Sequence, residues 1–208
     1  MLEGAVAAAF ARQAAFCRLF AAPLTGLVCE AAISALDDSS ATGRRIASWP
    51  GEPMADALMM RVTGAFNLLV RAGRAPALQP LYPPAALPDV ATLAAAIRTT
   101  LADPALDRAV HDFLDSPPQT NEVARAGVLF PGVMAAVAAC DGLPVRLFEL
   151  GASAGLNLNM DRFAYQLGAA TAGDASSPVQ LAPDWSGQPP PLAPVTVVAR
   201  SGVDISPL

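Results

Sequence analysis

The segment LFELGASAGLNLNMDRF (147–163) contains an acidic residue followed by small residues at alternate positions: Glu149, Gly151, Ser153 and Gly155. Two chemistries use this pattern. A G-x-S-x-G sequence at a sharp strand-to-helix turn can expose the serine hydroxyl as a nucleophile. A loop of small residues between a strand and a helix can instead let a nucleotide approach the backbone amides. A tight turn that binds nothing is the third interpretation.

The hydrolase interpretation requires an acid and then a histidine after Ser153 in chain order. The one histidine of the chain, His111, precedes Ser153 and lies next to Asp112 on a helix-like segment that also contains Asp115. The sequence has no HGGG-like segment for an oxyanion hole either. A serine hydrolase with Ser153 as its nucleophile is therefore a lesser alternative.

The nucleotide-binding interpretation needs fewer partners. The pattern E-x-G-x-S-x-G resembles the first motif of class I methyltransferases, E/D-x-G-x-G-x-G, with Ser153 in the place of the middle glycine. The dinucleotide fingerprint G-x-G-x-x-G fits this spacing less well. The resemblance implies that Glu149, Gly151, Ser153 and Gly155 form a loop that binds S-adenosylmethionine.

A second acidic residue is expected to bind the ribose hydroxyls, at the end of the second strand and about 20 residues after the loop. At that distance the chain has Gln166, which is not a carboxylate. The terminal VVARSGVDISPL resembles the second-strand signature of class I methyltransferases, which makes Asp204 the expected ribose ligand and residues 164–194 an insertion. The alternatives are Gln166 in this position, or Asp204 as a turn residue that caps a following helix.

A helix is expected from about Asn121 to Cys140, antiparallel to the strand that precedes the loop. About 20 helical residues span roughly 30 Å, whereas a six-residue strand spans about 20 Å. The helix should therefore begin beyond the carboxyl edge of the strand, where Gln119, Asn121, Glu122 and Arg125 would line the same crevice as the loop. The alternative is plain helix capping with a Glu122–Arg125 surface pair. No residue is assigned as a catalytic base.

The first 116 residues show apolar residues at three- and four-residue steps, and nothing there alternates like a strand. After Pro117-Pro118 the composition favours strands and short connections. The expected fold class is α/β: an N-terminal all-helical cap at 1–116, followed at 119–208 by the beginning of a Rossmann-like, class I methyltransferase-like sheet. The expected helices are 2–22, 23–36, 55–73, 90–103, 105–115 and 156–163, and the expected strands are 145–150, 164–168 and 195–200.

Composition narrows the classes of function. The net charge of −5 argues against a general nucleic-acid binder, which needs basic groups against phosphates. The chain has no lysine and one histidine, which excludes a Schiff-base lysine, a P-loop lysine and a metal site of several histidines. No uncharged apolar run reaches the length of about 18 residues that spans a bilayer. The expected partner is a small-molecule cofactor, with neither nucleic acid nor membrane.

The cysteines Cys17, Cys29 and Cys140 show no C-x-x-C spacing and occur in apolar, helix-like segments. We expect buried free thiols in a reducing cytoplasm, and no metal site. Glu3 precedes the first arginine, which is the reverse of the charge order in a signal peptide. A cytoplasmic location is therefore expected.

The segments QTNEVAR, LFELGASAGLNLNMDRFAYQLG and ARSGVDISPL closely resemble an uncharacterised bacterial family, domain-of-unknown-function family 2332. The likeness extends to RQAAFCRLFAAPLTGLV and AFNLLVRAG in the N-terminal part. Asn67 is a departure, since the family is expected to have a histidine there. The resemblance implies a methyltransferase-like α/β domain behind a helical cap, without an established activity.

The resemblance also implies that the chain ends early, because related proteins are expected to continue past GVDISPL. A sheet of two or three strands leaves its edges unpaired and one face half covered, so we expect a truncated chain or a homo-oligomer that covers the exposed edge. The expected function is an S-adenosylmethionine-dependent methyltransferase, or a relative that binds this cofactor, with an unknown acceptor. The alternative is a non-enzymatic interaction or scaffold protein with a degenerate nucleotide loop.

Overall fold

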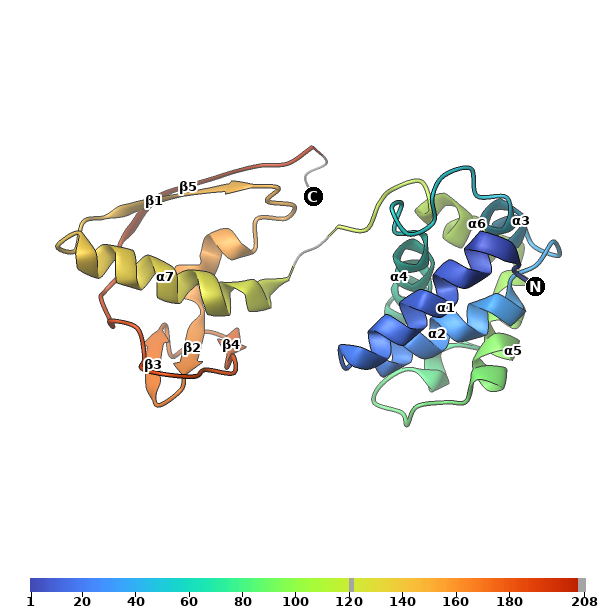
Figure 1. The fold of residues 1–208 in the computed structure, drawn as a ribbon, viewed down its shortest axis with the longest axis horizontal. Helices are drawn as coiled ribbons and strands as arrows, with labels where there is room; N and C mark the ends of the chain where they lie inside the picture. Colours follow the sequence, from blue (N-terminus) through green and yellow to red (C-terminus); the bar gives the residue numbers. More distant parts are fainter. Residues whose placement is uncertain (120–121, 206–208) are drawn as a thin grey trace. The chain divides into compact units, whose positions relative to one another are not determined.

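The computed structural model describes residues 1–119 and 122–205 (Figure 1). The chain divides into two compact units, Met1–Pro118 and Gln119–Leu208, where the sequence suggests domains at 1–116 and 119–208. Each unit has its own buried apolar core. Together the units make the chain a mixed α/β protein with a helical N-terminal part.

The first unit consists of helices and connections, and its residues, all of which the structure describes, include no strand. Each helix expected in this part of the sequence is found. The helix α3 is additional: the segment DDSSATG predicts a loop with helix-capping residues, and the Ser40 hydroxyl accepts a hydrogen bond from the Gly43 amide over 2.9 Å at the start of this helix. The elements are α1 (Gly4–Leu19), α2 (Pro23–Ala35), α3 (Ala41–Ala47), α4 (Leu58–Arg71), η1 (Gln79–Leu81), α5 (Val90–Leu101) and α6 (Pro104–Phe113).

Proline and glycine set helix boundaries where the sequence indicates them. Pro23 is the first residue of α2 and Pro104 the first of α6, positions where the missing N–H has no intrahelical partner to lose. α4 ends just before Gly73, which has a φ of +66°. The Arg74 amide then donates to the Leu69 carbonyl oxygen over 2.9 Å, a Schellman arrangement that satisfies the end of the helix.

The core of the first unit forms where α1, α2, α4 and α5 pack together. α1 and α2 approach closely, since a Cβ on Gly26 would lie 3.1 Å from the carbonyl oxygen of Ala14. Trp49 packs against this core and donates its indole N–H to Asp56 over 2.7 Å. The largest fully buried side chains here include Phe10, Phe66, Leu36, Ile46, Leu93 and Ile97.

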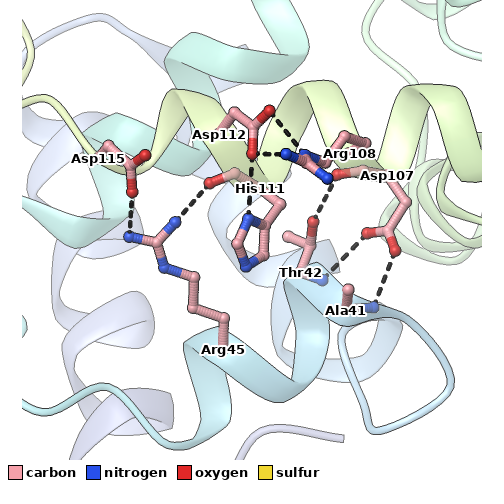
Figure 2. A network of polar contacts seen from close by, with 8 residues as sticks. All are labelled: Ala41, Thr42, Arg45, Asp107, Arg108, His111, Asp112 and Asp115. Atoms are coloured by element: carbon pink, nitrogen blue, oxygen red, sulfur yellow. Dashed lines mark hydrogen bonds and ion pairs between the residues drawn. The ribbon is translucent and has the colours of Figure 1, made fainter.

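Asp107 of α6 connects that helix to the start of α3 (Figure 2). Its carboxylate accepts hydrogen bonds from the amides of Ala41 (2.8 Å) and Thr42 (3.0 Å), and the Thr42 hydroxyl donates to the Asp107 carbonyl oxygen (3.0 Å). Arg45 of α3 extends toward α6 in turn and donates to the His111 carbonyl oxygen over 2.6 Å. These contacts satisfy amides at the start of α3 and fix the short helix against α6.

The second unit combines a helix with two small sheets. β1 and β5 form a parallel pair, and in the other sheet β2 lies between β3, its antiparallel neighbour, and β4, its parallel neighbour. The β2–β4 sheet thus falls in the chain between the two strands of the parallel pair. The elements are η2 (Val123–Arg125), α7 (Ala126–Ala139), β1 (Val145–Leu150), η3 (Asn157–Arg162), β2 (Ala164–Leu167), β3 (Ala170–Gly173), β4 (Gln180–Leu181) and β5 (Val197–Val203).

Two helical segments of the second unit differ from expectation. The helix expected at 121–140 is shorter, because α7 begins only at Ala126, after the 3-10 turn η2; Asn121 lies outside the described residues. The segment after the small-residue loop is the 3-10 element η3 rather than an α-helix, with non-helical backbone at Asn159. The Leu158 carbonyl accepts a hydrogen bond from Arg200 of β5 over 3.0 Å, and this is a group that an α-helix would use internally.

The second core lies between α7 and the β2 sheet. Phe130 and Met134 of α7 are buried against Tyr165 of β2, and the rings of Phe130 and Tyr165 stack with their centroids 4.8 Å apart. The Tyr165 hydroxyl donates to the Met160 carbonyl oxygen over 2.6 Å. Trp185 packs against the same cluster.

The parallel pair is covered on one side only. Leu147 and Glu149 of β1 are half-buried on the inner side, whereas Phe148 and Leu150 on the outer side are 72% and 86% exposed. Leu150 pairs with Val203 of β5, which is also exposed. The carboxyl ends of the two strands therefore meet at one edge of the sheet.

Candidate functional site

The loop after β1 turns by means of left-handed backbone at alternate residues. Gly151, Ser153 and Gly155 have φ values of +72°, +50° and +66°. Glycine adopts this region freely, whereas any other L-residue is strained there by roughly 1–2 kcal/mol. The three small residues of the sequence pattern therefore occur at the three positions where the backbone conformation favours glycine. At the middle position the backbone of Ser153 is strained.

The loop is held against the end of β5. The amides of Gly151 and Ala152 both donate to the Val203 carbonyl oxygen, over 2.8 and 3.1 Å. Gly202 permits this approach, because a Cβ at that position would lie 2.6 Å from the Cβ of Ala152 and 3.1 Å from Leu158 Cδ1. The sequence interpretation did not single out Gly202, although its place just before the expected ribose ligand is a signal that could have done so.

Asp204 lies directly beside the loop. Its Oδ2 accepts a hydrogen bond from the Ser153 amide over 2.7 Å, and the residue is half-buried. Gln166 is on β2, in the other sheet, where its side-chain amide donates to the Gly168 carbonyl oxygen over 2.6 Å. Of these two candidates for the second-strand position, the structure brings Asp204 to the loop.

The Ser153 hydroxyl is also engaged. Ser153 is buried, and its Oγ donates a hydrogen bond to the side-chain oxygen of Gln119. Gln119 therefore lies next to the loop, as expected from the position predicted for the start of the helix. The contact gives the serine an amide acceptor, whereas a hydrolase needs an imidazole in this place. The one histidine, His111, belongs to the first unit and contacts Asp112 of its own helix at 3.4 Å.

The other candidates from the helix start form a surface pair. Arg125 donates to Glu122 over 3.3 Å, and both side chains are more than half exposed. A surface pair between Glu122 and Arg125 is the alternative that the sequence leaves open. Such a pair contributes only about 0–1 kcal/mol to the stability of the protein. The contacts described for Glu122 and Arg125 do not connect either residue to the loop, and Asn121 lies outside the described residues.

Two oxygens next to the loop have no hydrogen-bond donor among the described residues. One is Oε2 of Glu149, on the strand before the loop, and the other is Oδ1 of Asn157, on the element after it. Both atoms are buried. A buried acceptor without a donor is destabilising by about 1–3 kcal/mol, so a bound molecule with N–H or O–H groups would be favoured here.

A shallow hollow of about 210 Å³ lies over the loop. The loop residues 152–155, Leu158 and the end of β5 at 202–204 line it. Whole small-molecule sites usually enclose roughly 300–1,000 Å³. The hollow therefore has room for part of a nucleotide, such as a sugar, rather than for all of it.

The described residues contain neither a metal-binding cluster nor a membrane-spanning helix. Among these residues no group of three or more His, Cys, Asp or Glu side chains is arranged to hold a metal ion. None of the helices that the structure describes has both the length and the apolar character needed to cross a membrane.

These features define a two-unit α/β protein whose second unit presents a glycine-containing loop and an aspartate at the carboxyl ends of two parallel strands. The chain matches the family described as "Uncharacterized protein conserved in bacteria (DUF2332)" over residues 7–208, and it belongs to this family. The resemblance to domain-of-unknown-function family 2332 is thereby confirmed. No curated protein matches the chain, and no solved structure matches it.

Proposed function

We propose that the second unit binds S-adenosylmethionine at the loop 151–155, as a methyltransferase or as a relative that retains only cofactor binding. The observation that carries this proposal is the hydrogen bond between Asp204 and the Ser153 amide. It brings together an acidic residue at the end of one parallel strand and a glycine-containing loop at the end of its neighbour. Open α/β sheets bind nucleotides at such an edge.

The residues around the loop fit parts of this cofactor. The Asp204 carboxylate would accept hydrogen bonds from the ribose hydroxyls, and the hollow over the loop is of a suitable size for that sugar. Glu149 has a buried oxygen without a hydrogen-bond donor in the part of the chain that the structure describes, and the ammonium group of the methionine part would supply one. In this interpretation β1 and β5 are the first two strands of a Rossmann-like sheet, and residues 164–194, with the β2–β4 sheet, are an insertion.

The helix dipole contributes little in this proposal. The loop leads into the short 3-10 element η3, so the binding of the cofactor would depend on hydrogen bonds from side chains and on close approach to Gly151, where a Cβ would meet nothing within 4 Å. When bound, the cofactor would supply an electrophilic methyl group. The role of the chain's own residues would be to hold and orient it.

Calorimetry tests the proposal with S-adenosylmethionine and S-adenosylhomocysteine. We expect both to bind, and Asp204→Asn to weaken both by at least about tenfold, because a charge-assisted hydrogen bond is lost. Asp184→Asn is the matched control, since Asp184 is an exposed residue of the same unit. Absence of binding heat for both compounds with the wild-type chain would remove the proposal.

The outer face of the parallel pair favours a second candidate function, an interaction protein. Phe148, Leu150 and Val203 are exposed there, whereas parallel sheets are usually covered on both faces. A second copy of the chain could cover them, as in the expected homo-oligomer. Sedimentation velocity over a range of concentrations should then show a dimer that Phe148→Ser weakens, and a concentration-independent monomer would contradict this function.

A further inference from the structure

A hollow of about 460 Å³ lies in the first unit, between α2, α4 and the segment at Tyr82. We propose that it binds a small carboxylate with an apolar body, such as an arylalkanoic acid. The hollow is made of residues of the first unit alone. The proposal therefore does not rest on cofactor binding by the loop of the second unit, and either can fail without the other.

Apolar and small residues form most of the wall. The volume falls in the range of roughly 300–1,000 Å³ that is usual for small-molecule sites, which are mostly apolar with a few polar groups that set orientation. An aromatic ring with a short alkyl chain is of this size. The residues of this part of the wall are Leu24, Val28, Met60, Gly64, Val70, Pro83 and Pro118.

The polar groups of the wall gather on one face of α4. Thr63, Asn67 and Arg71 follow one another at four-residue steps, which places them on the same side of the helix. Thr25 of α2 and Tyr82 complete the polar part of the lining. Asn67 and Arg71 are both exposed, and within the described residues their side chains form no hydrogen bond or ion pair, so their N–H groups are available to a ligand.

The charge of the wall selects the class of ligand. Among the described residues that line the hollow, Arg71 is the one with a charged side chain, in a chain whose net charge is −5. A guanidinium pairs with a carboxylate through two parallel hydrogen bonds, and one positive charge matches one negative charge. A phosphate dianion has two negative charges, and Arg71 would neutralise only one of them. A protonated amine would be repelled by the positive charge of Arg71. A monocarboxylate is therefore the best match.

Tyr82 adds a hydrogen-bond donor. The residue is buried, and burial raises the pKa of its hydroxyl from 10.0 to about 12. A tyrosine hydroxyl is protonated at neutral pH whether or not its pKa is raised, so Tyr82 can donate to a carboxylate oxygen, and its ring is part of the lining.

The test uses the full chain and two probes of the same shape, hydrocinnamate and its neutral amide, measured by ligand-observed NMR titration. We expect the carboxylate to bind at least about tenfold more tightly than the amide, because it alone can pair with Arg71. Arg71→Gln should abolish that preference. Arg74→Gln, a change of an exposed arginine close to the same helix end but outside the lining, should preserve it.

Two tryptophan substitutions test the location. Asn67→Trp should fill the hollow and prevent the binding of both probes, whereas Leu68→Trp, at the exposed neighbouring residue, should not. Circular dichroism of each variant verifies that the helical unit is folded. Equal binding of the two probes, an unchanged preference in Arg71→Gln, or unchanged binding in Asn67→Trp would each overturn the proposal, as would the absence of binding to the wild-type chain.

Discussion

At the scale of single residues, Ser153 is the most strained position described in the loop. Its φ of +50° lies in the left-handed region, and its hydroxyl donates to Gln119. Ser153→Gly removes the strain and the hydrogen bond, whereas Ser153→Ala removes the hydrogen bond and keeps the strain. We therefore expect the glycine variant to exceed the alanine variant in free energy of unfolding by about 1 kcal/mol. Urea unfolding of both variants measures this difference, and equal stabilities would contradict the strain argument.

The three cysteines should differ in reactivity. Cys17 and Cys29 are buried, as the sequence predicts, but the prediction was wrong for Cys140, which directly follows α7 and is exposed. Burial also raises the pKa of the Cys29 thiol to about 12, so little thiolate forms there at neutral pH. A chromogenic disulfide reagent should modify one thiol rapidly in the folded protein and all three in denaturant. Cys140→Ser should remove the rapid phase; if it persists, this assignment is wrong.

The sequence predicts much of the candidate site at this scale, for a physical reason. The spacing of Gly151, Ser153 and Gly155 reflects a local backbone requirement, and local requirements are visible in a sequence. Gly202 was missed because its requirement is a contact with Ala152, about fifty positions earlier in the chain. The sequence also cannot predict that Oε2 of Glu149 has no hydrogen-bond donor among the described residues. That property depends on the groups that surround this half-buried side chain in the fold.

At the scale of elements, α3 depends on a residue far away in the chain. Asp107 of α6 accepts hydrogen bonds from the amides of Ala41 and Thr42 and is itself buried. Asp107→Ala should lower the free energy of unfolding by about 2–3 kcal/mol, because two amides at a helix start lose their acceptor. Asp112→Ala, at an exposed position on the same helix, should leave the stability near the wild-type value. Thermal or urea unfolding measures both, and similar losses for the two variants would contradict this role.

The elements that the sequence predicts best are those with internal signals. Pro23 and Gly73 bound helices whose apolar residues repeat at helical spacing, and these helices are found. At 156–163 the sequence predicts a short helix, and the structure has the 3-10 element η3 there. Its 3-10 form was not predicted, because Arg200 of β5 donates to the Leu158 carbonyl and the local sequence cannot show this contact. The short strands β3 and β4 were missed as well, because strands of two to four residues have too few positions to reveal alternation.

At the scale of the whole molecule, stability should decline in alkali. The two tyrosines of the chain lie in different units, and burial raises the pKa of Tyr82 from 10.0 to about 12 and raises that of Tyr165 as well. A raised pKa means that the contribution to stability is complete below pH 10 and is lost as the pH rises through about 12. The urea concentration at the unfolding midpoint should therefore decrease as the pH rises above 10. For the first unit, this decrease should be less steep in Tyr82→Phe than in the wild-type chain. Phenolate absorbance that develops near pH 10 in the folded protein would contradict this expectation.

Each of the two units contains one tryptophan. Trp49 packs in the first unit and Trp185 in the second, and the chain has no other tryptophan. Each unit consequently has its own intrinsic fluorophore. If one tryptophan is replaced, the remaining tryptophan fluorescence comes from the other unit alone. Melting curves of the two single-tryptophan proteins would then reveal whether the halves come apart together or one after the other, a distinction that no single curve of the native chain could provide.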